Sequence, residues 1–190
     1  MKFLDKDGEL KYAYSTSWGT STRKIGALVM SHGDQRGLKL PPVVAPIQVI
    51  VVPIAQHKEG VIDKAQEIVA KLCKMGIRAE ADVRDASPGW KFNEWEMKGV
   101  PVRLEIGPRD IENNECQVFR RDTLVKETIK LNHIEQYVTN LLEKIQITML
   151  ENATKVRDQR IKDVKTFSDL QKSVNAGNFV LAPWCNCTEC

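Results

Sequence analysis

The stretch IQVIVVPIAQHKEGVIDKAQEIVAKLCKMGIRAEADV, residues 47–83, predicts a strand, a helix and a second strand in succession. Residues 47–54 are almost continuously apolar, as expected of a central strand that is covered on both faces. Apolar residues then recur at helical spacing, and Gly76 marks the end of that helix. Residues 77–83 alternate, with these members predicted to face the core: Ile77, Ala79, Ala81 and Val83. This succession indicates an α/β fold whose sheet is at least partly parallel.

The chain after residue 83 continues the alternation of helices and strands. A short helix is predicted over 89–98, followed by strands over 102–106, 115–121 and 124–130. A longer helix begins near Asn132, where Asn132 and Glu135 resemble a capping box, and it extends to about residue 160. A second, shorter helix is predicted over 168–175.

The residues before this stretch predict a smaller unit that ends in a proline-rich joint. Asp7-Gly8 is a hairpin signal, and a helix is predicted to start near Arg23, with Ser21 or Thr22 as its cap. One hairpin cannot cover the apolar side of that helix, so residues 1–42 are expected to be the end of something larger. LPPVVAP, residues 40–46, stiffens the chain and indicates a domain boundary.

The overall composition is that of a globular protein and excludes few functions. The 190 residues are 42% hydrophobic and 28% charged, with a net charge of +3. No apolar run approaches the ~20 residues needed to cross a bilayer, and the charged opening MKFLDKDGELKY lacks the apolar stretch of a signal peptide. We therefore expect a cytoplasmic protein without a membrane segment. A net charge this small does not indicate a nucleic-acid partner, so local clusters of basic residues matter more.

Three of the five cysteines gather at the end of the chain. Cys73 and Cys116 lie alone within apolar patterns and are interpreted as small core residues, whereas Cys185, Cys187 and Cys190 occupy the last six positions. An odd count without a secretory signal argues against a disulfide framework. Cys185 with Cys190, or Cys187 with Cys190, can reach one zinc ion, but a structural site needs four ligands. The alternative is an exposed, reactive cysteine tail, and a zinc-dependent enzyme is not supported because too few ligands are present.

Aromatic and basic residues are interleaved between residues 90 and 109. The aromatic residues are Trp90, Phe92 and Trp95, and the basic ones are Lys91, Lys98, Arg103 and Arg109. Aromatic faces stack on unpaired bases while cations hold the phosphates. Glu96 adds a carboxylate, which can accept hydrogen bonds from the N1–H and N2–H groups of guanine. The pattern therefore suits a guanine that is turned out of a base stack.

Simpler explanations exist for the same residues. Phe92 and Trp95 are three positions apart on the predicted helix, and spacing alone favours packing on the sheet over base binding. Arg120 and Arg121 are more typical of a solvated strand end than of a phosphate site. In TSWGTSTR, residues 16–23, a helix start that favours anions places Arg23 where it could meet a phosphate, although a polar helix cap is the commoner explanation.

Three segments together resemble the prolyl-tRNA synthetases, a family of class II aminoacyl-tRNA synthetases. STSWGTSTRKIGALVMSHGDQRGLKLPPVVAPIQVIVVPI is similar to the third signature motif of class II enzymes joined to an anticodon domain. PGWKFNEWEMKGVPVRLEIGPRD with FRRD is similar to the anticodon-recognition region. The ending WC-x4-C resembles the start of the zinc-binding C-terminal domain of the archaeal- and eukaryotic-like branch. The resemblance runs from about Tyr14 to Cys190.

The resemblance implies a role for each matching position. Ser17, Trp18, Gly19, Ser21 and Arg23 would line the ATP and proline pocket, with Arg23 on the ATP phosphates. Phe92 would stack on an anticodon base, Glu96 and Arg103 would read guanine edges, and Lys126 would support these contacts. Cys185 and Cys190 would supply half of a four-cysteine zinc site, and Cys187 falls outside the usual pattern. The upstream residues that complete the catalytic site, and the second pair of zinc cysteines, lie outside this sequence.

The implied protein is the C-terminal part of proline–tRNA ligase, which activates L-proline with ATP and Mg and transfers it to tRNA(Pro). Residues 1–42 would end the catalytic domain, 43–145 would form the anticodon-binding domain, and 146–190 would begin an α/β zinc-type domain. The implied parent enzyme is a homodimer, and this part alone is expected to be catalytically inactive. The alternative is a stand-alone anticodon-domain-like module that binds RNA without ligase activity.

Overall fold

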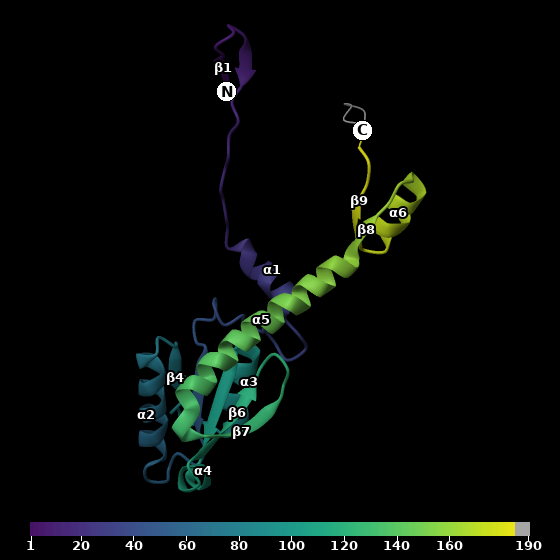
Figure 1. Cartoon of the computed structure of the whole chain (residues 1–190). Helices are drawn as coiled ribbons and strands as arrows, with labels where there is room; N and C mark the ends of the chain where they lie inside the picture. Colours follow the sequence, from purple (N-terminus) through teal and green to yellow (C-terminus); the bar gives the residue numbers. More distant parts are fainter. Residues whose placement is uncertain (185–190) are drawn as a thin grey trace.

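A computed structural model describes residues 1–184 of the chain. Its largest unit is a five-stranded sheet flanked by helices (Figure 1). In chain order the elements are β1 (Lys2–Leu4), β2 (Leu10–Tyr12), α1 (Arg23–His32), β3 (Val49–Pro53), α2 (Val61–Lys74), β4 (Ala79–Ala81), α3 (Pro88–Lys98), β5 (Val102–Ile106), α4 (Pro108–Glu112), β6 (Glu115–Arg120), β7 (Lys126–Lys130), the 3-10 helix η1 (Leu131–His133), α5 (Ile134–Arg160), β8 (Ile161–Asp163), α6 (Phe167–Asn175) and β9 (Phe179–Leu181).

The central sheet has the strand order β4-β3-β5-β6-β7. β3 pairs in parallel with both β4 and β5, while β6 pairs antiparallel with β5 and β7. Along the chain, α2 connects β3 to β4, α3 connects β4 to β5, a segment with α4 connects β5 to β6, and a short loop connects β6 to β7. The predicted α/β class with a partly parallel sheet is therefore confirmed.

Helices α2 and α5 cover one face of this sheet and form the main core. The face of α2 toward the sheet contributes Ala65, Ile68 and Leu72, and β5 contributes Val102, Leu104 and Ile106. α5 adds a stripe of six buried residues, which are Ile134, Val138, Leu141, Leu142, Ile145 and Met149. Burying this much apolar surface on one side accounts for most of the hydrophobic stabilisation of the domain.

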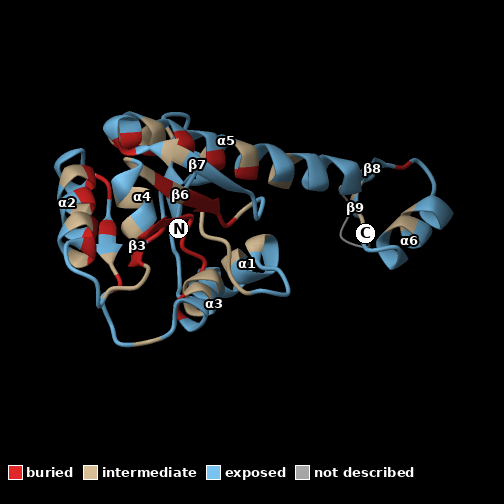
Figure 2. Ribbon diagram, turned by 90° about the horizontal axis from the view of Figure 1, so that it is seen from below, coloured by how far each residue is buried: buried red, intermediate tan, exposed pale blue. Residues whose placement is uncertain are grey.

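Helix α3 covers the opposite face, where the core is smaller. In Figure 2, α5 lies on one side of the sheet and α3 on the other. Phe92 and Trp95 pack against buried Ile50, Val52 and Val100. The sheet-packing interpretation of these two aromatic side chains is therefore confirmed. Ser87 is the N-cap of the helix, and its hydroxyl accepts a hydrogen bond from the backbone N–H of Trp90.

Two residues that were predicted to lie in the core, Val83 and Cys73, are exposed. Val83 is 42% exposed while Asp82 is only 3% exposed, because β4 ends at Ala81 and the following turn carries the carboxylate inward. Cys73 is exposed. Cys116 is a core residue as predicted, and burial raises the pKa of its thiol to about 12. A cysteine at that pKa is unreactive at neutral pH.

One predicted helix cap and one predicted solvated pair are also wrong. α5 begins after η1, and the Asn132 side chain accepts a hydrogen bond from Asn114 instead of forming a capping box. By contrast, Thr22 does occupy the N-cap position of α1, although its side chain forms no cap hydrogen bond. Arg120 and Arg121 are 9% and 1% exposed, because each forms an ion pair with a nearby carboxylate.

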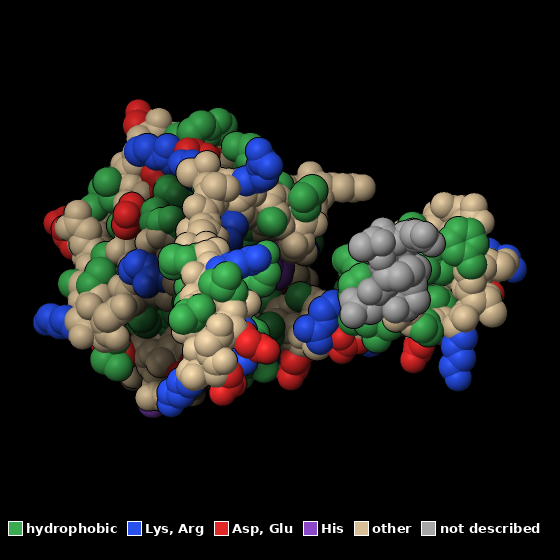
Figure 3. All heavy atoms as spheres, turned by 90° about the horizontal axis from the view of Figure 1, so that it is seen from above, with side chains coloured by type: hydrophobic (Ala, Val, Ile, Leu, Met, Phe, Trp, Pro, Cys, Tyr) green, Lys and Arg blue, Asp and Glu red, His purple; other side chains and the backbone are tan. Residues whose placement is uncertain are grey.

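The two ends of the described chain lie away from the central sheet. β1 and β2 form the predicted hairpin, which an extended segment joins to α1 (Figure 1). At the other end, α5 continues past the sheet to a small unit in which β8 pairs in parallel with β9 beside α6. Figure 3 shows this unit as a smaller body joined to the larger one, with Lys and Arg side chains mixed among acidic and apolar ones over the visible face.

Candidate nucleic-acid interface

On β5, the α3 face of the sheet carries charged side chains, whereas the other face carries apolar ones. Alternation along β5 directs Arg103 and Glu105 to the α3 face. Strand register places Phe119 beside Arg103 and Lys126 beside Phe119. One row across three strands therefore carries an arginine, an aromatic ring and a lysine, and α3 lies next to its β5 end.

Arg103 lies at the centre of this row, between two aromatic rings and two carboxylates. Its guanidinium carbon is 4.0 Å from the ring centroid of Phe92 and 4.2 Å from that of Phe119. Its nitrogens lie 3.0 Å from an oxygen of Glu96 and 3.0 Å from an oxygen of Glu105. Stacking on two rings and ion pairs with two carboxylates fix the guanidinium plane in one orientation.

Lys126 extends the cluster to the open side of the sheet. Its ammonium nitrogen is 2.6 Å from Glu105, and its side chain is 48% exposed. By contrast, the side chains of Glu96 and Arg103 are only 11% and 7% exposed. The four residues predicted to contact an anticodon, Phe92, Glu96, Arg103 and Lys126, thus form one contiguous cluster with Glu105 and Phe119.

Sequence reasoning missed Glu105 and Phe119. Glu105 could have been found, because it lies two residues after Arg103 on a predicted strand and so shares its face. Phe119 gives no such signal, since its position depends on the register between β5 and β6. The sequence does not give that register, so only the structure shows that the Phe119 ring stacks on Arg103.

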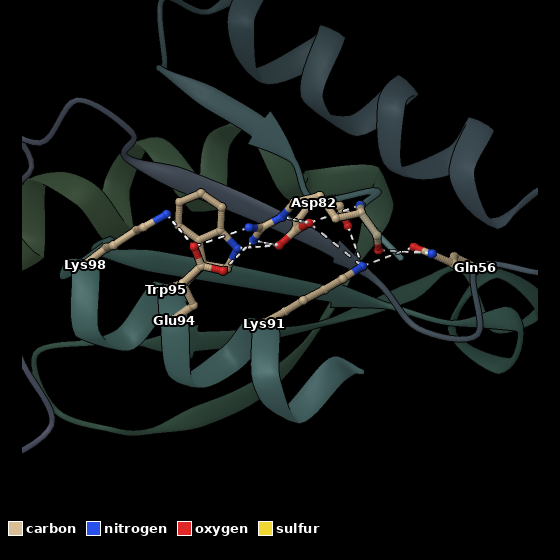
Figure 4. Close-up of polar contacts among 7 residues, drawn as sticks. Gln56, Asp82, Lys91, Glu94, Trp95 and Lys98 are labelled. Atoms are coloured by element: carbon tan, nitrogen blue, oxygen red, sulfur yellow. Dashed lines mark hydrogen bonds and ion pairs between the residues drawn. The ribbon is translucent and has the colours of Figure 1, made fainter. Parts of the chain in front are cut away.

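A second polar cluster, centred on Asp82, holds α3 against the sheet (Figure 4). Asp82 accepts hydrogen bonds from Arg84 at 2.7 Å and from the indole N–H of Trp95 at 2.7 Å. The buried ammonium of Lys91 donates to the backbone carbonyl of Asp82 at 2.9 Å and to Gln56 at 3.1 Å. These bonds satisfy charges that would otherwise be costly to bury, and they fix the rotation of the helix.

The pKa of Asp82 shows that its charge is strongly favoured in the folded protein. Burial acts to raise this pKa, but hydrogen bonds from Arg84 and Trp95 outweigh it, and the pKa falls from 3.8 to about 2. Arg84 also pairs with Glu94 at 2.7 Å on the outer side of α3. Asp82 therefore stays ionised at neutral pH and supports α3 through these fixed bonds.

Residues 34–40 are fastened to the C-terminal end of α3. Arg121 donates hydrogen bonds to both carboxylate oxygens of Asp34, at 2.7 and 2.9 Å, and to the backbone carbonyl of Glu96 at 2.8 Å. The Arg121 hydrogen bonds hold the pKa of Asp34 well below its usual range. The contact requires glycine, because a Cβ on Gly37 would lie 2.5 Å from the Cα of Met97. The specific sequence SHGDQRGLKL thus forms a fixed attachment beside the charged cluster.

The residues predicted for ATP and proline lie elsewhere in the molecule. Ser17, Trp18, Gly19 and Ser21 belong to the exposed segment before α1, and Arg23 is the first residue of that helix. Gly19, Ser21 and Arg23 line one open hollow. These residues are close neighbours in sequence, and they lie apart from the Arg103 cluster.

The predicted zinc ligands Cys185 and Cys190, with Cys187, lie outside the described residues. Within residues 1–184, no group of three or more His, Cys, Asp or Glu side chains is placed to hold a metal ion. In the same range, no helix is both long enough and apolar enough to span a membrane.

Comparison with known proteins identifies relatives along the whole chain. Residues 48–141 match the model of a family described as the anticodon binding domain. The chain is 53% identical over 190 residues to a proline–tRNA ligase of Alkaliphilus oremlandii, covering 99% of this chain and 39% of that protein. It is 48% identical to a proline–tRNA ligase of Clostridium novyi, covering 100% of this chain and 40% of that one. The chain thus spans about two fifths of the length of these curated relatives.

A solved structure is also similar to this chain over its whole length. A crystal structure of prolyl-tRNA synthetase from Cryptosporidium parvum, complexed with L-proline and AMP, superposes with a TM-score of 0.88 at 41% identity. The match covers 100% of this chain and 41% of that one. The Arg103 cluster lies within the matched domain, since it is formed by α3, β5, β6 and β7. Residues 48–141 therefore form an anticodon-binding domain, and the chain is a member of the proline–tRNA ligase family that corresponds to part of the full-length enzymes.

Proposed function

We propose that this chain recognises the anticodon of proline tRNA as part of a proline–tRNA ligase. The observation that carries the proposal is the cluster in which Phe92, Glu96, Arg103 and Lys126 meet at one side of the anticodon-binding domain. Buried partners fix the orientation of the polar groups before any ligand arrives, which lowers the entropy cost of binding. An exposed lysine at the edge suits the phosphate backbone that would accompany the base.

The chemistry of the cluster fits guanine better than the other bases. Proline codons begin with CC, so the anticodons end in GG. The Glu96 carboxylate can accept the N1–H and N2–H of guanine, and Arg103 can donate to the O6 and N7 edge. Phe92 offers a ring on which an unpaired base stacks. Cytosine presents acceptors where guanine presents donors, so it would give Glu96 no matching pair of hydrogen bonds.

The proposal extends to the parent enzyme, which would activate L-proline with ATP and Mg before transferring it to the tRNA. Residues 1–42 would complete the class II catalytic domain, with Ser17, Trp18, Gly19, Ser21 and Arg23 at the ATP and proline pocket. Residues 43–145 would bind the anticodon, and 146–190 would begin the zinc-type domain. Zinc held by Cys185 and Cys190, a homodimer and a cytoplasmic location belong to the same proposal. A stand-alone RNA-binding module is less consistent with TSWGTSTR, since such a module does not need part of a catalytic site.

The test compares two RNA hairpins that differ only at the last two anticodon positions, GG in one and CC in the other. The chain should prefer the GG hairpin at moderate salt, and Glu96→Ala should reduce that preference by about 1–3 kcal/mol. Glu94→Ala is the matched control, because Glu94 lies on the same helix but pairs with Arg84 and Lys98 on its outer side. Equal affinity of the unmodified chain for both hairpins would contradict the proposed function.

A further inference from the structure

The two oxygens of Glu96 have different partners. Oε1 lies 3.0 Å from Arg103, which is buried, whereas Oε2 lies 3.2 Å from Nη1 of Arg36, whose side chain is 58% exposed. Only 11% of the Glu96 side chain is exposed. Because so little of this carboxylate faces water, a base that approaches Oε2 from solvent meets Arg36 first.

The backbone of Arg36 is fixed although its side chain is exposed. Asp34 and Gly37 exchange backbone hydrogen bonds of 2.9 and 3.1 Å, and the N–H of Arg36 donates to the Asp34 carboxylate at 2.8 Å. Arg121 holds the same carboxylate from inside the domain. The turn formed by residues 34–37 therefore stays in place, and Arg36 can change its position only through its side-chain rotamers.

The Arg36–Glu96 contact is the weaker of the two and is suited to exchange. It consists of one hydrogen bond near the upper limit of a good N–H···O distance, and one partner is largely in water. Ion pairs of this exposed kind contribute little to stability. A guanine that donates N1–H and N2–H uses both carboxylate oxygens, and Arg36 is the partner that can make room for it. Arg103 is held in place by two rings and by Glu105.

We propose that Arg36 is a further nucleotide-contacting residue, which covers Glu96 in the free protein and moves to a phosphate when guanine takes its place. This inference rests on the proposed function. The displaced guanidinium stays within one side-chain length of the site, because the turn fixes its Cα next to α3. An arginine beside a bound nucleotide pairs well with a phosphate, through charge and through its planar donors. The arrangement keeps Glu96 partnered in both states.

The experiment measures binding of the GG and CC hairpins to the full chain over a range of salt concentrations. Arg36→Gln should weaken both hairpins about five-fold at 0.1 M salt and reduce the slope of log K against log salt by roughly 0.7 to 1, the amount expected for one lost phosphate contact. The preference for GG should persist, since Glu96 and Arg103 are intact. Arg36→Lys should restore most of the slope, because the charge alone suffices for a phosphate.

Lys74→Gln is the matched control, since it removes one exposed positive charge from α2 on the opposite face of the sheet. It should leave affinity and slope close to the wild-type values. An Arg36→Gln variant that binds GG RNA as tightly as wild type, or more tightly, with an unchanged slope would overturn the inference while leaving the proposed function intact. A wild-type chain without any GG preference would overturn both, and unfolding curves of each variant verify that it is folded.

Discussion

The two faces of the central sheet differ most along β5, where one face is apolar and the other is charged. On the α2 and α5 face, β5 buries Val102, Leu104 and Ile106, none of which is measurably exposed. On the α3 face the same strand buries Arg103 and Glu105, at 6% and 5% exposure. Along β5 both faces exclude water to a similar extent, so burial alone does not distinguish a structural surface from the proposed recognition surface.

The difference teaches what the buried charges contribute. Apolar burial stabilises a domain by roughly 25 cal/mol per Å² removed from water. A buried ion pair is often no better than a hydrophobic pair of the same volume, because the cost of desolvation offsets the attraction. Arg103, with its two carboxylate partners, is therefore better explained by the rigid orientation it gives to donors and acceptors than by added stability.

The largest effect is expected on the apolar face. Leu104→Ala removes a fully buried side chain between α2 and α5 and should lower the free energy of unfolding by about 3–5 kcal/mol. Urea denaturation measures this, and RNA affinity below the transition should stay unchanged. A large loss of RNA preference in the folded variant would mean that the two faces are not separable.

A smaller effect is expected at the attachment between residues 34–40 and α3. Arg121→Ala removes the bonds to Asp34 and to the backbone of Glu96, and should cost about 2–3 kcal/mol because Lys39 still pairs with Asp34 at 3.0 Å. The exposed pair offers a comparison, since Arg36→Gln should cost less than about 1 kcal/mol. Similar unfolding free energies for the two variants would show that the Arg121 pair is no stronger than a surface pair.

Asp82 should make the free energy of unfolding depend on pH. Its pKa is about 2 in the folded protein against an ordinary 3.8, so ionised Asp82 stabilises the fold above pH 4, and this stability is lost as the pH falls toward 2. The loss should amount to about 2 kcal/mol. Comparing unfolding at pH 5 and pH 2.5 measures it, and Asp82→Asn should show a correspondingly smaller dependence on pH. An unchanged dependence in that variant would place the acid sensitivity elsewhere, for example at Asp34.

Sequence alone predicted the elements of the fold well, because the dominant signals are local. The continuous apolar run at 47–54, the periodicity of α2 and the glycine at its end all depend on neighbouring residues, and β3 and α2 were located correctly. The long helix was predicted to extend to about residue 160, where α5 does end. The predicted start was wrong by two residues, because η1 comes before α5 and Asn132 bonds to Asn114 across the fold.

The candidate site was predicted only in part, because its geometry depends on contacts between distant residues. Residue type and spacing pointed to Phe92 and Glu96, which share one helix. The partner ring Phe119 comes from β6, and the partner of Arg121 is Asp34, which lies 87 residues away. Burial of Arg121 was missed for the same reason, whereas Arg120 pairs with Asp122 only two residues away, a local signal that the sequence did offer.

The smallest change in stability is expected at Arg103, the central residue of the proposed anticodon-contacting cluster. Arg103→Met keeps a long side chain between the rings of Phe92 and Phe119, and each abandoned carboxylate retains another partner, Arg36 for Glu96 and Lys126 for Glu105. The free energy of unfolding should therefore fall by only about 1 kcal/mol, while the preference for GG over CC falls by about 1–3 kcal/mol. Urea denaturation and hairpin binding, measured on the same preparation, check the two values. A variant that loses several kcal/mol of stability but keeps its RNA preference would reverse the assignment of the two faces, because Arg103 would then act as a structural residue.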